Sequence, residues 1–135
     1  MIKKLYIISL LSLMSSVTQA KVIEIDGQQD LDNKLKHPHV VIKFYRPGCP
    51  HCRAIESDYK KISDKANKDR KDKIIFLGIN TDTKGNQTIY PKWKVNGVPK
   101  LFFVKNGQKK EIPRKRDFAQ SFEKDIHEHF DSKSQ

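Results

Sequence analysis

The sequence predicts a single α/β domain in which helices cover both faces of a mixed β-sheet. Short apolar and β-branched runs alternate with segments that have the apolar spacing of amphipathic helices. The last two predicted strands flank Asn106-Gly107, which is a strong signal for an antiparallel hairpin. In chain order the elements follow the pattern β-α-β-α-β-α-β-β-α, which places parallel and antiparallel strands in one sheet.

Five strands and four helices account for this pattern. The strands are expected at residues 22–25, 39–44, 73–79, 101–104 and 109–112, with the last at an edge of the sheet. The helices are expected at residues 28–36, from 50 onward, at 86–93 and at 117–130. Pro91 makes the third helix short and irregular. In the other three, apolar side chains recur at helical spacing: Leu31, Leu35, Ile55, Tyr59, Ile62, Phe118, Phe122, Ile126 and Phe130.

The first twenty residues have the composition of a secretory signal peptide. Lys3 and Lys4 precede an apolar run over residues 5–14, and Thr18-Gln19-Ala20 is a small-x-small cleavage pattern. The run is shorter than the ~20 residues that a membrane span needs. We therefore expect cleavage after Ala20 rather than an uncleaved anchor. Residues 21–135 would then form one domain in the periplasm or outside the cell.

The chain is strongly basic, with a net charge of +11. Without residues 1–20, which hold two lysines and no acidic residue, 25 basic and 16 acidic residues remain and the charge is +9. Such a surface is compatible with nucleic-acid binding, but the predicted signal peptide directs the chain away from nucleic acid. We therefore interpret the lysines as a solvated surface and expect no nucleic-acid partner.

The only two cysteines of the chain stand three positions apart, in Cys49-Pro50-His51-Cys52. Pro50 favours the first position of a helix, and Cys49 before it is expected to cap that helix. Residues i and i+3 share a helix face, so the two sulfur atoms fall within disulfide reach. The amides at a helix N-terminus stabilise a thiolate over a thiol. The motif therefore predicts a redox-active pair that exchanges its disulfide with other molecules.

Two other uses of the pair are less favoured. A bridge across two intervening residues closes a small loop and restrains the unfolded chain little, which argues against a structural disulfide. Two thiolates, with His51 beside them, suit Cu(I) or Zn and make a metal-binding chaperone the binding alternative. A structural zinc site takes four ligands, and the sequence has no second cysteine pair. We therefore expect no metal and no cofactor.

Three landmarks, in order and at familiar spacing, resemble the thioredoxin family over residues 22–130. The first is the strand that leads into the cysteine motif. The second is the strand at 74–79 followed by Asn80-Thr81-Asp82, and the third is Val98-Pro99 before an apolar strand and the Asn106-Gly107 turn. The resemblance implies a thioredoxin fold, a central mixed sheet flanked by helices on both faces, and thiol–disulfide oxidoreductase activity.

The resemblance also implies roles for individual residues. Cys49 is the exposed sulfur that attacks a client or is attacked by it, and Cys52 resolves the mixed disulfide. A cis bond between Val98 and Pro99 lies against the cysteines, and the backbone of Val98 pairs with the client chain. These two residues are thus the predicted substrate-binding positions.

The dipeptide Pro50-His51 is expected to set the redox poise, and it is similar to that of the bacterial oxidant DsbA. His51 also offers a proton donor or a positive charge near the first sulfur. Two positions depart from the family: Gly48 replaces the usual active-site tryptophan, and Lys43 replaces a buried acid that moves protons to and from Cys52. We expect the lysine either to snorkel outwards or to favour a thiolate.

We therefore expect a monomeric, exported thiol–disulfide oxidoreductase that donates the Cys49–Cys52 disulfide to client protein thiols. The direction depends on potential and partners, so a periplasmic reductant of client disulfides is the alternative. With no further cysteine, a membrane redox partner must regenerate the pair. A third class, a redox-inactive interaction module, would not need intact cysteines and Pro99. Four histidines are interpreted as surface or loop residues: His37, His39, His127 and His129.

Overall fold

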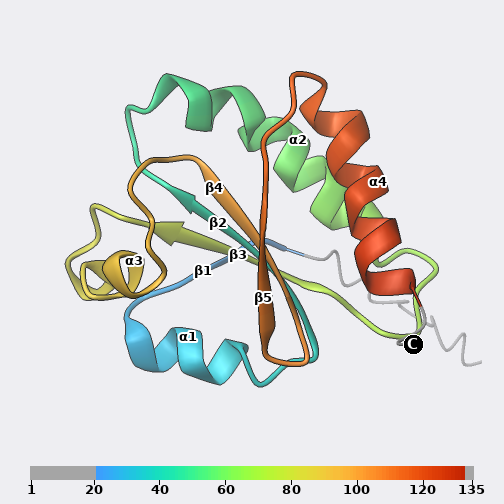
Figure 1. The fold of residues 1–135 in the computed structure, drawn as a ribbon, viewed down its shortest axis with the longest axis horizontal. Coiled ribbons are helices and arrows are strands. Elements are labelled where there is room, and N and C mark those ends of the chain that lie inside the picture. Colours follow the sequence, from blue (N-terminus) through green and yellow to red (C-terminus); the bar gives the residue numbers. More distant parts are fainter. Residues whose placement is uncertain (1–20, 133–135) are drawn as a thin grey trace, which may run out of the picture.

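A computed structural model describes residues 21–132, so the predicted signal peptide at 1–20 lies outside the described residues. Its centre is a five-stranded sheet in the order β1-β3-β2-β4-β5 (Figure 1). The strands are β1 (Ile23–Glu24), β2 (His39–Tyr45), β3 (Ile75–Asn80), β4 (Lys100–Lys105) and β5 (Gln108–Ile112). β3 runs parallel to β1 and β2, whereas β4 is antiparallel to both β2 and β5. The predicted mixed sheet is confirmed.

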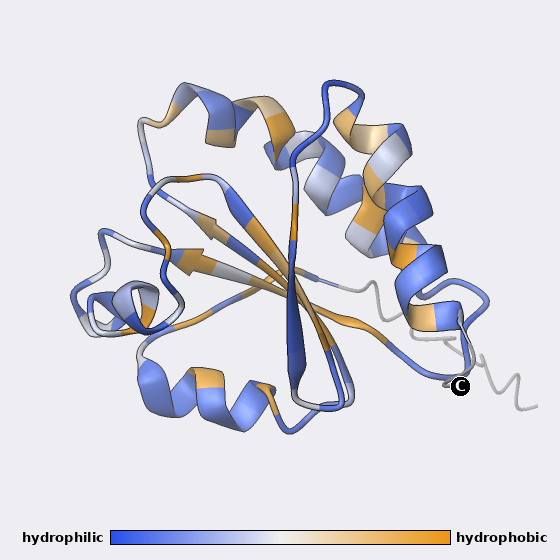
Figure 2. Ribbon diagram, viewed as in Figure 1, coloured by the Kyte–Doolittle hydropathy of each residue, from blue (hydrophilic) through white to orange (hydrophobic). Residues whose placement is uncertain are grey.

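Helices cover both faces of this sheet. They are α1 (Gln28–Lys34), α2 (Pro50–Ala66), α3 (Ile89–Lys92) and α4 (Phe118–Asp131). The buried side chains of α2 and α4 pack in one hydrophobic cluster, and those of α1 and α3 pack in the other. Figure 2 shows the consequence along the chain: the inner strands are mostly hydrophobic, the edge strand β5 is mostly hydrophilic, and the helices alternate hydrophobic and hydrophilic residues. This alternation is the apolar spacing from which the helices were predicted.

The segment between β3 and β4 differs from the prediction. In place of one irregular helix over 86–93, the structure has a 3₁₀ turn at Lys84–Asn86 and then the single turn of α3. The reason is the fully buried side chain of Asn86. Its amide donates to the carbonyls of Ile25 and Asn80, both at 3.0 Å, and its oxygen accepts the Gly27 N–H at 2.8 Å. These bonds fix the turn to β1 and β3, so the helix starts only later.

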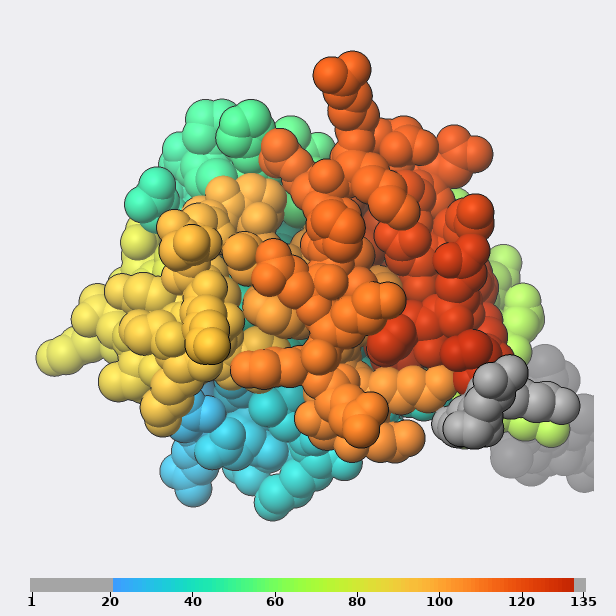
Figure 3. All heavy atoms as spheres, viewed as in Figure 1, coloured from blue at the N-terminus to red at the C-terminus, as the bar shows by residue number. Residues whose placement is uncertain are grey.

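The strand β5 forms one edge of the sheet. Its first four residues are exposed, and only Ile112 is buried. From the viewpoint of Figure 3, side chains of this strand and of α4 form a large part of the visible surface. Lys109 reaches from β5 over the ring of Trp93, with its ammonium 4.6 Å from the ring centre. The edge therefore presents charge rather than apolar surface.

Two histidines are more buried than the sequence suggested. His39 lies on β2, is 9% exposed, and has its ring 5.2 Å from that of Phe130. His129 on α4 is partly buried, with its ring 5.2 Å from Phe103. The surface interpretation is therefore wrong for His39 and incomplete for His129, because the C-terminal end of α4 packs on the first residue of β2. Within residues 21–132, His39 Nδ1 and His129 Nε2 have no hydrogen-bond partner.

We expect acid to destabilise the protein through this pair. Burial and then Arg70 lower the pKa of His39, while burial and then Lys110 lower the pKa of His129. An unfolded histidine titrates near ~6.5. Below that pH the unfolded chain binds more protons than the folded chain, so the free energy of unfolding falls until the folded histidines also become protonated. Urea unfolding between about pH 8 and about pH 5 measures this slope.

The matched variants separate these histidines from other acid effects. Replacing both, as His39→Gln with His129→Gln, is expected to flatten the slope below about pH 6.5. The exposed His51 on α2 lies outside this pair, and His51→Gln is the matched control variant. Parallel pH curves for the wild type and the double variant would refute this explanation.

Candidate functional site

The cysteine motif lies where β2 gives way to α2. Gly48 has a positive φ of 78°, a conformation that glycine adopts without strain, and it turns the chain into the helix. Cys49 is the N-cap of α2 with extended angles (φ −80°, ψ 113°), as expected for a residue before proline. Pro50 then occupies the start of the helix, where its missing N–H costs no hydrogen bond. The predicted cap is confirmed.

The Cys49 sulfur lies between two backbone groups. It accepts the N–H of Cys52 at 3.2 Å, and its thiol donates to the carbonyl of Val98 at 3.7 Å. Both cysteines are reduced in the structure, and their exposed fractions are 7% for Cys49 and 4% for Cys52. The residue predicted as exposed is therefore mostly covered, because its sulfur turns inward to Val98 and the first turn of α2.

The two thiols have opposite acidities. Burial raises the pKa of Cys49, but hydrogen bonds from the Cys52 thiol and from the amides of Cys52 and His51, with the charge of Arg46, lower it overall. Burial, the hydrogen bond to Cys49 and the charge of that neighbour raise the pKa of Cys52 to about 11. Cys49 is thus the preferred thiolate and Cys52 retains its proton. This division suits one sulfur to first attack and the other to a later step.

The sheet register brings the loop before β4 to the cysteines. Phe44 on β2 pairs with Lys100 on β4 in the antiparallel ladder, so Val98 and Pro99 lie beside the end of β2 (Figure 1). The peptide bond between Val98 and Pro99 is cis, as the resemblance implied. The structure therefore brings together Cys49, Cys52 and Val98, although Val98 lies 49 positions after Cys49 in the sequence.

The remaining predicted residues surround this centre. Pro50 and His51 are exposed on the first turn of α2, so the dipeptide is open to solvent. Lys43 is 5% exposed, so the expectation that it snorkels outwards is wrong. No sequence pattern singles out Glu24 or Tyr45, although the Tyr45 hydroxyl donates to the Glu24 carboxylate at 2.8 Å and the Tyr45 ring centre lies 5.0 Å from the ammonium of this lysine. The partners come from strands 21 positions apart, and no motif joins them.

Comparison with known proteins places the chain in a family. The family model described as thioredoxin matches residues 21–128. The chain belongs to the thioredoxin family. With its Cys-x-x-Cys pair at the N-terminus of α2, it is a thiol–disulfide oxidoreductase of the thioredoxin and protein disulfide-isomerase type. The fold and the enzyme class predicted from the sequence are thereby confirmed.

Solved thioredoxins have the same fold. The chain superposes on a thioredoxin of Trypanosoma brucei brucei with a TM-score of 0.71 at 16% identity, covering 87% of this chain and 97% of that one. A thioredoxin mutant from Halobacterium salinarum gives a TM-score of 0.67 at 21% identity, covering 82% and 92%. At these identities the likeness concerns the fold alone.

The curated relatives are longer proteins. The chain is 24% identical over 110 residues to a protein disulfide-isomerase of Ricinus communis, which is 78% of this chain and 22% of the relative. It is 36% identical over 76 residues to protein disulfide-isomerase A3 of Gallus gallus, 56% of this chain and 14% of the relative. The chain thus corresponds to about a fifth or less of either relative.

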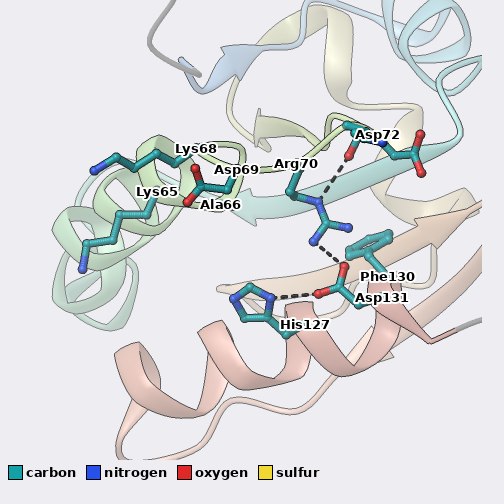
Figure 4. Close-up of a pocket in the computed structure, with 10 residues that line it drawn as sticks. Lys65, Ala66, Lys68, Asp69, Arg70, Asp72, His127, Phe130 and Asp131 are labelled. Atoms are coloured by element: carbon teal, nitrogen blue, oxygen red, sulfur yellow. Dashed lines mark hydrogen bonds and ion pairs between the residues drawn. The ribbon is translucent and has the colours of Figure 1, made fainter.

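A separate pocket of about 690 Å³ lies at the other end of α2, and its lining mixes basic and acidic side chains (Figure 4). Arg70 and His127 both contact the carboxylate of Asp131, which links the loop after α2 to α4. Lys65 lies thirteen positions after Cys52 on α2, which corresponds to about 20 Å of helix, so the pocket is not part of the cysteine site. Within residues 21–132 no three His, Cys, Asp or Glu side chains form a group that could hold a metal ion.

Proposed function

We propose that this protein is an exported oxidoreductase that donates the Cys49–Cys52 disulfide to client proteins. The observation that carries the donor direction is the capping position of Cys49. There the amides of His51 and Cys52 and the charge of Arg46 favour its thiolate. A stabilised thiolate makes the reduced enzyme favourable, and its disulfide is correspondingly more oxidising. The Pro50-His51 dipeptide, similar to that of DsbA, supports the same direction.

The donor reaction follows from the two acidities. A client thiolate attacks Cys49 Sγ, the Cys49–Cys52 bond breaks, and Cys52 leaves as a thiolate that takes up a proton. A second client thiolate then attacks the client sulfur in the mixed disulfide and releases Cys49 as the thiolate that the site favours. The client loses two electrons and the cysteine pair gains them. The backbone of Val98, beside the sulfur, is where a client segment would pair as a short strand.

Export and regeneration complete the proposal. The composition of residues 1–20 supports cleavage after Ala20 and delivery to an oxidising compartment, where a donated disulfide persists. A membrane redox partner would then re-oxidise the pair. Among residues 21–132, no helix reaches the length and apolarity that crossing a membrane requires. N-terminal sequencing of protein from an envelope fraction tests the export: we expect Lys21 first, and an intact Met1 would reject it.

The reduction potential of the cysteine pair tests the donor direction. We expect equilibration with glutathione buffers to give a value near the DsbA end of the scale, about −120 mV. A value near that of thioredoxin, about −270 mV, would reject the donor and establish a reductant of client disulfides. The match of residues 21–128 to the thioredoxin family model supports this second candidate. For this two-electron couple, ~30 mV corresponds to a tenfold change in the equilibrium constant, so the alternatives are well separated.

A further inference from the structure

Lys43 is a buried cation that the proposed reaction does not yet use. It lies on β2 under α2, and its ammonium is 4.6 Å from the ring centre of Tyr59 and 5.0 Å from that of Tyr45. An unpaired ammonium in an apolar interior is costly, and two aromatic faces offset part of that cost. The lysine is therefore held at a defined place rather than extended into solvent.

A carboxylate lies two strands away from this cation in the same row of the sheet. In the sheet, Lys43 pairs with Gly78, and Gly78 pairs in turn with Glu24 on β1. A Cβ at Gly78 would lie 2.6 Å from Glu24 Oε1, so the carboxylate would have to move to admit a side chain there. The glycine thus leaves the space that the carboxylate occupies in the row beside Lys43. Tyr45 joins the two charges, since its ring faces Lys43 and its hydroxyl donates to Glu24 at 2.8 Å.

The face of α2 that covers Lys43 also carries the second cysteine. Cys52 and Tyr59 are seven residues apart on α2, two helical turns, and both are buried on the face toward the sheet. Burial lowers the pKa of Lys43, whereas Glu56, Glu24 and Cys52 raise it and Lys60 lowers it. Two tyrosine rings thus contact this lysine. The charges that act on it from β1 and α2 are those of two carboxylates, one thiol and one further lysine.

We propose that Lys43, held against the rings of Tyr45 and Tyr59, is a positioning residue whose charge favours the thiolate of Cys52 in the resolving step. The inference rests on the proposed function, in which Cys49 forms mixed disulfides. In this step Cys52 releases its proton to water and bonds to Cys49 Sγ, and the client sulfur leaves as a thiolate and takes up a proton. Over the two steps that form and resolve the mixed disulfide, the cysteine pair loses two electrons and the client disulfide gains them, which is the reverse of donation.

The mixed disulfide is the state in which this charge has its largest effect. The hydrogen bond and the negative charge of Cys49 both raise the pKa of Cys52 in the reduced protein. Once the Cys49 sulfur is bonded to a client, it carries neither a proton nor a charge, and both contributions disappear. Burial then remains as the main effect that raises the pKa of Cys52. Lys43 is the positive side chain whose charge lowers that pKa and so favours the thiolate.

The first test measures the acidity of Cys52 directly in the full chain. In a Cys49→Ser background Cys52 is the only thiol, and its rate of alkylation by iodoacetamide against pH reports its ionisation. Adding Lys43→Met is expected to raise the midpoint by about one pH unit. Lys43→Arg should restore it, and Lys60→Met, which removes an exposed lysine near the same site, should leave it unchanged.

The second test follows resolution when both cysteines are present. A small aromatic disulfide reacts with Cys49, and attack by Cys52 then releases a second aromatic thiol in a step independent of reagent concentration. Lys43→Met should slow that release roughly three- to tenfold at neutral pH, because fewer thiolates form while each becomes more nucleophilic. The first step, at Cys49, should change less than roughly twofold.

The role of Lys43 and the proposed donor direction can each be rejected without rejecting the other. An equal Cys52 midpoint and an equal release rate in Lys43→Met and Lys60→Met would overturn the role of Lys43. Neither measurement involves a client or the reduction potential, so a thioredoxin-like potential would reject the donor direction and leave this result intact. Replacing a buried ion by an apolar side chain of similar volume is often neutral for stability. If Lys43→Met does not fold, Lys43→Gln provides the same neutral comparison.

Discussion

Replacing Cys49 with serine should abolish disulfide exchange without unfolding the protein. Serine is a good helix N-cap, so its oxygen can accept the Cys52 N–H that the Cys49 sulfur accepts now. The nucleophilic sulfur is lost, however, and no other cysteine lies outside the pair. We expect oxidation of a reduced dithiol peptide, and reduction of insulin, to fall to background. Circular dichroism should remain that of the wild type.

The Cys52→Ser variant provides the matched comparison. It retains the attacking sulfur but has no thiol to resolve the mixed disulfide. Covalent adducts between Cys49 and the peptide should therefore accumulate, and mass spectrometry of the alkylated mixture detects them. Equal residual activity in the two variants would contradict the roles assigned to these sulfurs.

Changing the dipeptide between the cysteines should make the disulfide less oxidising. In Pro50→Gly with His51→Pro, the proline removes the residue-51 amide that helps to stabilise the Cys49 thiolate. A hydrogen bond to a charged group contributes about 1.5–3 kcal/mol. For a two-electron couple this corresponds to a shift of roughly 30–60 mV toward more negative potential. Equilibration with glutathione measures the shift.

His51→Ala separates the amide from the imidazole. This variant retains the residue-51 N–H and removes only the exposed ring. If the backbone donor dominates, the alanine variant keeps a potential close to that of the wild type while the double variant moves. If the ring dominates, both variants move together. An unchanged potential in the double variant would show that the dipeptide does not set the redox poise of this protein.

The parts of the site that sequence predicted are those formed by neighbours along the chain. A proline after Cys49 and a helical repeat after it predict the cap, because both act within one turn. The β-branched run before it predicts β2, and Asn106-Gly107 predicts the hairpin that joins β4 to β5. The cis bond at Val98 came from the family resemblance, since proline alone favours neither isomer strongly enough.

The parts that sequence did not predict depend on partners far along the chain. Lys43 is buried on β2, where the ring of Tyr59, 16 positions later on α2, packs against its ammonium. His39 is buried because Phe130, near the other end of the chain, packs on its ring. Neither contact can be inferred from a local sequence pattern, because its two partners lie far apart along the chain. The same limit applies to Asn86, whose buried amide looks like an ordinary turn residue until β1 lies beside it.

The exposed edge strand β5 affects how readily the protein would aggregate with unfolded chains. An open strand with unpaired backbone groups is a template for other strands, and unfolded clients supply many of them. Along β5 the exposed side chains include Lys109, Lys110 and Glu111, and the charges that a second strand would meet there oppose its addition. Under the proposed function, a client segment pairs at Val98 while no second strand adds to β5. The enzyme is thereby protected from co-aggregating with unfolded chains.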